Sequence, residues 1–167
     1  MSAMSTSESE SWQFEDSVTI AVEPEVLYEM ISDPARTGEW SPVCRGGEWL
    51  EGGTGKVGDR FTGRNVVGKR RWTTVSEVVV ANPPREFAWV VAPDKGGTAR
   101  WGYVIEPLEM GSRLTESWRV DENGLAWLRE HLGPHTAEQR RDAAWEGIPA
   151  TLAAVKHVAE REAASGC

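Results

Sequence analysis

The feature that most constrains this chain is a run of extended segments between residues 43 and 120, followed by one long helical pattern. Glycine and proline punctuate the run at 51–55, 82–84, 93–97 and 109–112, and such residues mark turns. The sequence therefore predicts six strands, near 43–50, 58–67, 70–81, 85–92, 98–107 and 112–120. Because the connections are short, successive strands should be hairpin neighbours in one antiparallel sheet.

A further strand is predicted before this run, because residues 12–22 alternate between apolar and polar side chains. Its apolar face consists of Trp12, Phe14, Val18, Ile20 and Val22. Two short helices should follow. The first begins near Pro24, since proline suits the first turn of a helix, and the second covers 36–40.

The C-terminal region changes period, which predicts a long helix. Its apolar residues recur at helical spacing, with charged residues on the opposite face: Trp145, Ile148, Leu152, Val155 and Val158 or Ala159. Pro149 removes a backbone donor, so the helix should kink or split near 146–147. Residues 121–135 predict a separate helical turn or two that ends at Gly133 and Pro134.

Together these elements predict an α+β fold: a seven-stranded antiparallel curved sheet wrapped around the long C-terminal helix, with two short helices after strand one. A sheet this wide twists and curls, and one helix does not fill the concavity. A cavity between sheet and helix is therefore expected. The 167 residues suffice for one domain with its own core. We expect a disordered N-terminal tail over 1–10 and a single domain over 11–163.

The strand phases place aromatic side chains on the concave face. Trp72, Trp89, Trp101 and Trp118 come from separate strands, with Tyr103 among them. Any single tryptophan is most simply explained as core, because large aromatic rings dominate core burial. Together, rigid rings leave gaps between them, and their buried N–H groups need acceptors. The set therefore predicts a wall suited to a flat aromatic or polycyclic ligand.

One carboxylate interrupts this face, because Glu116 lies between Leu114 and Trp118 on the inward side of its strand. An ionised carboxylate in an apolar wall is costly, so its pKa should rise. Two interpretations stay open: Glu116 accepts a hydrogen bond and stabilises the fold, or it orients a ligand or moves a proton. Asn65 shares the face, and Glu116 and Asn65 are the candidate catalytic residues.

The candidate ligand-binding set combines the inward positions of the strands with the apolar face of the last helix. It comprises Phe61, Asn65, Trp72, Thr74, Ser76, Val78, Trp89, Trp101, Tyr103, Leu114, Glu116, Trp118, Trp145, Ile148 and Leu152. No metal is expected, because Gly133 and Pro134 separate His131 from His135. No cofactor is expected, because the glycines of "GGTGKVGDR" lack the phosphate-loop pattern.

Charge and cysteine content narrow the expected partners. A net charge of -8 argues against nucleic acid, whose binding depends on Lys and Arg. Two cysteines, Cys44 and Cys167, make no disulfide framework, which favours a cytoplasmic location. Residues 1–12 lack the pattern of a signal peptide, and no apolar run suits membrane insertion. We expect a monomer or homodimer whose partner is a hydrophobic small molecule.

Six segments occur in a recognisable order: "VEPEVLYEMISDPARTGEWSP", "VGDRFTGRN", "RRWTTVSEVVVANPPREFAW", "RWGYVIEP", "SRLTESW" and "GIPATLAAVKHVAE". Over roughly residues 12–162 this order resembles the START-like, or SRPBCC, superfamily with its helix-grip fold, and most closely the bacterial polyketide cyclase/dehydrase-type members. The resemblance implies a ligand between the sheet and the last helix. Because "FTGRN" and "TESW" match recurring family patterns, it also implies cavity roles for Asn65 and Glu116.

Three functions are compatible with these observations. The first is a binding module that encloses a hydrophobic, aromatic or polyketide-like molecule. The second is a polyketide cyclase or aromatase, in which Glu116 transfers protons and Asn65 or Tyr103 holds an enolate oxygen. The third is a protein-partner module, chaperone-assisting or stress-related, that uses residues 43–50 or 121–135.

Overall fold

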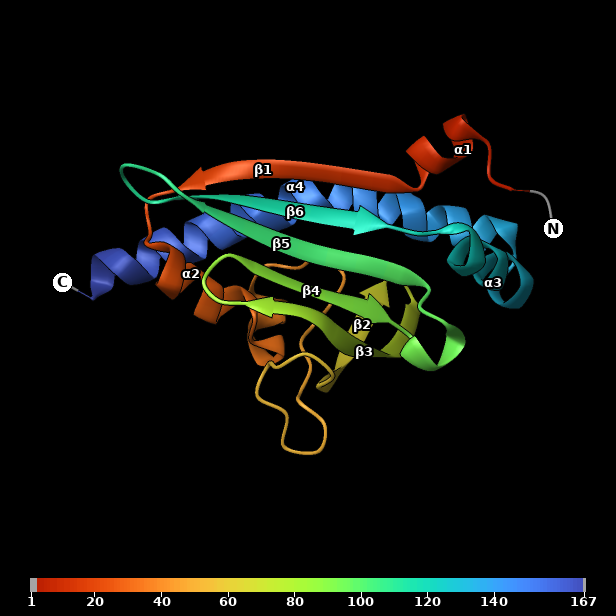
Figure 1. Cartoon of the computed structure of the whole chain (residues 1–167), viewed down its shortest axis with the longest axis horizontal. Coiled ribbons are helices and arrows are strands. Elements are labelled where there is room, and N and C mark those ends of the chain that lie inside the picture. The colour runs from red at the N-terminus through yellow and green to blue at the C-terminus, as the bar shows by residue number, and fades with distance from the viewer. Residues whose placement is uncertain (1–2, 167) are drawn as a thin grey trace.

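The computed structural model describes residues 3–166, which form an antiparallel sheet bent around helices (Figure 1). The six strands are β1 (Gln13–Ile20), β2 (Arg60–Val67), β3 (Arg70–Asn82), β4 (Glu86–Val91), β5 (Ala99–Pro107) and β6 (Ser112–Arg119). Their order across the sheet is β1-β6-β5-β4-β3-β2. Short turns join β2 through β6 as neighbours, as predicted, and β1 closes the sheet by pairing with β6.

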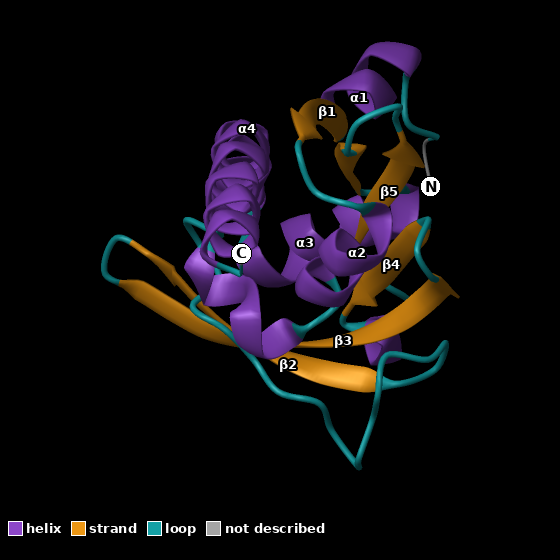
Figure 2. Ribbon diagram, turned by 90° about the vertical axis from the view of Figure 1, so that its left-hand side faces the viewer, coloured by secondary structure: helices purple, strands orange, loops and turns teal. Residues whose placement is uncertain are grey.

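The helices are α1 (Thr6–Ser11), α2 (Pro24–Ile31), the 3-10 turns η1 (Pro34–Glu39) and η2 (Pro93–Lys95), α3 (Glu122–Leu132) and the long α4 (Pro134–Ser165). Of these, α2, α3 and α4 lie on the concave side of the sheet (Figure 2), whereas α1 lies beside the start of β1. The two short helices expected after strand one are α2 and η1. Pro24 opens α2 at its first turn, and Leu27, Met30 and Ile31 bury its inner face.

The prediction of a seventh strand over 43–50 is wrong. This segment follows the outer edge of β2, where the amides of Thr62 and Arg64 donate to the carbonyls of Glu48 and Gly46. The next such amide, on Val66, donates to Val43, so the register slips by one residue. Gly46 allows the slip because its φ is +125°. Only two isolated bridges remain, Cys44 with Asn65 and Trp49 with Phe61.

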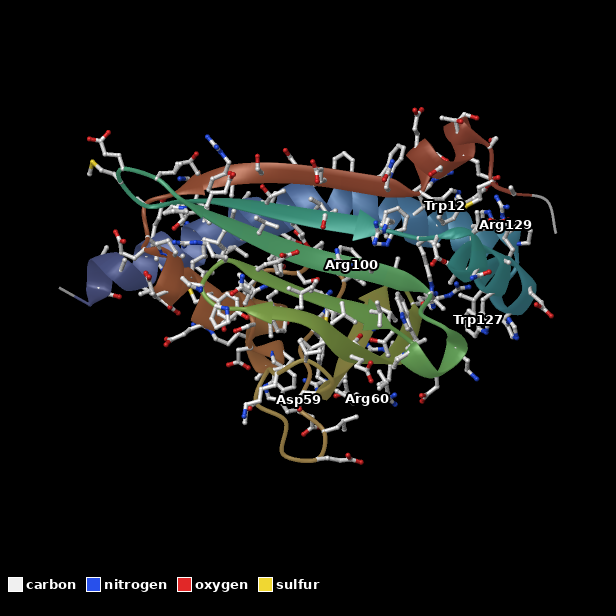
Figure 3. All side chains as sticks on the ribbon, viewed as in Figure 1. Trp12, Asp59, Arg60, Arg100, Trp127 and Arg129 are labelled. Atoms are coloured by element: carbon white, nitrogen blue, oxygen red, sulfur yellow. The ribbon has the colours of Figure 1, made fainter. Side chains whose placement is uncertain are left out.

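Residues 6–10, expected within a disordered tail, form most of α1 instead. The Ser5 hydroxyl accepts from the Glu8 amide at 3.2 Å, which caps the helix. The Glu8 carboxylate pairs with Arg129 of α3 at 2.7 Å. Arg129 also lies over the ring of Trp12, 5.9 Å from its centroid (Figure 3). These contacts explain a helix that composition alone did not predict.

The predicted long C-terminal helix is confirmed, but it does not split at 146–147. Helix α4 runs without a break from Pro134 to Ser165, with Pro149 inside it. Pro149 and Trp145, four residues earlier, both lie on the exposed side. Water can therefore solvate the Trp145 carbonyl that loses its helical donor. On the buried side, Ile148, Leu152 and Val155 pack into the core.

Two neighbouring residues of α4 should have opposite effects on stability. Ile148→Ala should lower the free energy of unfolding by about 2–5 kcal/mol, because Ile148 is 0% exposed and its removal leaves a cavity. Pro149→Ala should raise it by about 1–3 kcal/mol, because alanine restores a helical donor on the solvent side. Urea denaturation of both variants measures this. A stability loss in Pro149→Ala would contradict the solvent-side account.

Candidate functional site

The cavity predicted between sheet and helix is present and has a volume of about 210 Å³. Its floor is the inner face of β2 through β6, its roof is the first half of α4, and the end of α2, η1 and residues 40–44 close one side. The predicted residues that line it are Phe61, Asn65, Trp72, Thr74, Ser76, Trp89, Trp101, Tyr103, Glu116 and Trp118.

Five predicted ligand-binding residues do not line the cavity. Val78, Leu114, Ile148 and Leu152 belong to the packed core beside it, each no more than 2% exposed. Trp145 lies on the outer side of α4, 39% exposed, and its ring contacts Phe14 at 6.0 Å. Period alone does not separate a cavity wall from solid core, and it wrongly placed Trp145 on the buried face of the last helix.

The aromatic wall arises from the register of the strands. Trp89 of β4 pairs with Trp101 of β5, which in turn pairs with Trp118 of β6. The Trp89 and Trp101 rings stack with centroids 6.5 Å apart and an angle of 10°. Tyr103 lies 5.8 Å from the Trp89 ring, and Phe61 lies 6.0 Å from it. Cross-strand partners share one face of a sheet, so these rings form a continuous surface beside the cavity.

Glu116 lies in the cavity wall, with only 4% of its surface exposed. Its Oε1 accepts a hydrogen bond from the Tyr103 hydroxyl at 3.4 Å, and its Oε2 is buried without a hydrogen-bond partner. Burial raises the pKa of Glu116 to about 8, and the Tyr103 hydrogen bond only partly opposes this. At neutral pH the carboxyl group is therefore mostly protonated, and it can donate a hydrogen bond into the cavity.

Asn65 is held differently. Its Nδ2 donates to the Gly63 carbonyl at 3.2 Å and to Thr74 Oγ1 at 3.3 Å, which ties it to β2 and β3. Within residues 3–166 no hydrogen bond joins Asn65 to Glu116. Asn65 lines the cavity, but the Glu116 carboxyl has Tyr103 as its partner. The two candidate catalytic residues thus do not form one hydrogen-bonded unit.

Sequence reasoning missed the roof of the cavity. Arg140, Ala144, Gly147 and Thr151 of α4 all line it. Their spacing of three or four residues places them on one helical face. A stripe of small residues beside the large Ile148 and Leu152 was the available signal. The small side chains leave space under the helix, whereas their large neighbours fill it.

Arg140 is the cationic group of this roof. Its guanidinium carbon lies 4.6 Å from the centroid of the Trp72 ring, and its Nε is buried without a hydrogen-bond partner. Burial lowers the pKa of Arg140, and nearby Arg70 lowers it further. Among the described residues, no group of three or more His, Cys, Asp or Glu side chains is placed to hold a metal ion.

A family model described as "Polyketide cyclase / dehydrase and lipid transport" matches residues 11–153. The chain belongs to this family. The predicted resemblance to the START-like, or SRPBCC, superfamily is thereby confirmed. A comparison with curated protein sequences yields no match. Within residues 3–166, no helix has the length and apolar character needed to cross a membrane.

Solved structures agree with the family. A Polyketide_cyc-like protein of Corynebacterium glutamicum is 44% identical, with a TM-score of 0.65 over 90% of this chain and 93% of that one. The Zhui aromatase/cyclase of a Streptomyces species is 22% identical, with a TM-score of 0.70 over 90% and 94%. The di-domain aromatase/cyclase StfQ of the steffimycin pathway is 18% identical, with a TM-score of 0.67 over 95% and 54%. The last two likenesses establish the fold alone.

The raised pKa of Glu116 should make stability depend on pH. From its usual value near 4.5 up to about 8, the folded protein keeps a proton that the unfolded chain has lost. The free energy of unfolding should therefore fall as pH rises through this range, by up to about 1.4 kcal/mol per pH unit from this group. Glu116→Gln lacks this loss, because its amide stays neutral.

Urea denaturation of both proteins at several pH values between 4 and 9 measures this difference. The stability of Glu116→Gln relative to the natural protein should rise with pH and level off above about 8. Other titrating groups are common to both proteins and cancel in the comparison. A relative stability that stays constant across the range would contradict a buried, protonated Glu116.

Proposed function

We propose that this protein binds a hydrophobic, aromatic or polyketide-like small molecule in the cavity between its sheet and helix α4, in the cytoplasm. The observation that carries the proposal is the cavity itself, of about 210 Å³ and walled by Trp89, Trp101 and Tyr103. An apolar cavity of about 150 Å³ binds benzene, so this one suits a ligand of about two fused rings. The two-cysteine content supports the reducing compartment.

A cavity-filling variant tests this proposal. Ala144 lines the cavity from α4 and is buried, so Ala144→Phe should occupy the ligand's space. Its matched control is Ala150→Phe, the same change on the exposed side of the same helix. With 2-naphthamide as a neutral two-ring probe, calorimetric titration should show saturable binding to the natural protein and the control. Binding to Ala144→Phe should weaken at least about tenfold, because the overlap leaves no room for the rings.

Circular dichroism of each variant verifies that the fold is retained. The absence of saturable binding to the natural protein by 2-naphthamide, 2-naphthol and naphthalene alike would count against the proposal. Equal binding to both phenylalanine variants would place the probe outside this cavity.

A second function, that of a polyketide cyclase or aromatase, is favoured by the free Oε2 of Glu116. A protonated carboxyl group beside the space for the ligand is suited to give its proton to a carbonyl oxygen of the ligand while an enol carbon bonds to the carbon of that carbonyl. The resulting carboxylate takes the O–H proton of the attacking enol, which becomes a ketone, and the acid is restored. In the dehydration the acid protonates the new hydroxyl, which leaves as water, and the carboxylate takes the proton from the neighbouring carbon as the C=C bond forms. The Tyr103 hydroxyl stabilises that carboxylate by its hydrogen bond. The aromatase/cyclase names of structural relatives support this class of reaction.

Glu116→Gln separates the two functions. If the protein cyclises a poly-β-keto thioester analogue, this variant should lose about 10²–10⁴-fold in turnover, since the amide has no acidic proton to transfer. Its affinity for 2-naphthamide should change little, because Gln keeps the size and neutrality of the protonated acid. Product formation is followed by chromatography and mass spectrometry. Undiminished turnover would remove Glu116 from the mechanism.

A further inference from the structure

Arg140 presents an unbalanced positive charge to the cavity. Several arginines of the protein have carboxylate partners, among them Arg60, which pairs with Glu77 at 3.0 Å, and Arg141, which pairs with Asp142 at 3.1 Å. No ion pair is formed by Arg140 with any side chain in residues 3–166. Its Nε is shielded from solvent and has no hydrogen-bond acceptor. A buried donor of this kind costs stability unless something pairs with it.

The other ionisable groups of the cavity do not supply the missing negative charge. Glu116 lines the same cavity, but its pKa of about 8 keeps it mostly neutral at pH 7. Burial raises the pKa of the Cys44 thiol and of the Tyr103 hydroxyl, so both stay protonated. The nearby Arg70 adds a second positive charge. At neutral pH the cavity therefore has a cation and no anion among its described lining residues.

The contact with Trp72 fixes the guanidinium group but leaves it able to bind. A guanidinium that lies on an aromatic ring is held by its flat face, while its N–H groups point outward in the plane. These edges match a carboxylate, which accepts two parallel hydrogen bonds from arginine. The Arg140 guanidinium carbon lies over the Trp72 ring, 4.6 Å from its centroid, which is within the range of such a contact. Arg140 thus has the features of an anchor for an acidic group rather than of a surface charge.

We infer that the cavity selects an aromatic acid: Arg140 binds the ligand's carboxylate, while the ring system lies against the tryptophan wall and Glu116 hydrogen-bonds a neutral oxygen of the ligand. This inference deepens the proposed binding function and rests on it. It narrows the ligand class from any hydrophobic molecule to ionised two-ring acids. A neutral polyketide chain or an uncharged lipid leaves the Arg140 guanidinium without a negatively charged partner.

The test compares 2-naphthoate with 2-naphthamide, two probes of nearly equal shape that differ in charge at pH 7. Calorimetric titration of the natural protein should give naphthoate an affinity at least about tenfold higher, as expected for a charge-assisted hydrogen bond in a shielded site. In Arg140→Met this preference should disappear, because methionine keeps the apolar stem but has no charge to pair with the carboxylate.

The neighbouring Arg141→Met is the matched control. The Arg141 guanidinium also lies near tryptophan rings, 5.5 Å from the Trp12 centroid and 5.8 Å from that of Trp145, but it pairs with Asp142 and does not line the cavity. This variant should keep the full preference for naphthoate.

Octanoate distinguishes an aromatic acid from a fatty acid, and it should bind more weakly than naphthoate because it does not stack on the rings.

Each outcome has a separate meaning. Equal affinities of the natural protein for naphthoate and naphthamide would overturn the acid selectivity while the binding function stands. A preference that survives in Arg140→Met, or is lost equally in Arg141→Met, would overturn the role of Arg140. Octanoate binding as tight as naphthoate would overturn the aromatic part of the inference. Failure of both naphthalene probes to bind would overturn the proposed function together with the inference.

Discussion

The structure depends on how one helix packs against a curved sheet with side chains of very different size. The large residues Ile148, Leu152 and Val155 fill the space between α4 and the strands β1 and β6. On the same buried side of α4, the smaller side chains of Ala144, Gly147 and Thr151 line the cavity. Protein interiors are otherwise packed to crystal density. The contrast along one helix therefore decides where the protein is solid and where it is hollow.

The chemistry of the hollow follows from strand register. Tyr103 and Glu116 face each other because β5 and β6 pair in a register that aligns them. A shift of that register by one residue would turn Glu116 to the outer surface. The same pairing aligns Trp101 with Trp118, so the acid and the aromatic wall are specified together. The position of Glu116 is thus set by the same strand pairing that holds the sheet together.

Much of the fold and of the cavity wall was predictable from the periodicity of the apolar residues and from the glycines and prolines at the turns. Strand phases placed ten of the proposed ligand-binding residues correctly on the cavity wall, since alternation is enforced by burial of one face. The residue types of segment 43–50 predict a strand, but its register slip at Gly46 arises from contact with β2, which lies later in the chain. Arg140 escaped prediction because its neighbours Trp72 and Arg70 are about seventy residues away in sequence.

The irregular segment 43–50 also determines whether the β2 edge of the sheet can pair with a strand of another chain. The outward amides of Thr62, Arg64 and Val66 already donate to this segment, so β2 has no free ladder to offer another chain. At the opposite border the Thr19 carbonyl of β1 accepts from Lys156 of α4 at 2.7 Å. An open sheet with unsatisfied borders is a template for intermolecular strand addition and fibril growth. Segment 43–50 therefore withdraws the β2 border from such pairing, whereas at the β1 border the Lys156 side chain covers the carbonyl of Thr19 near the end of the strand.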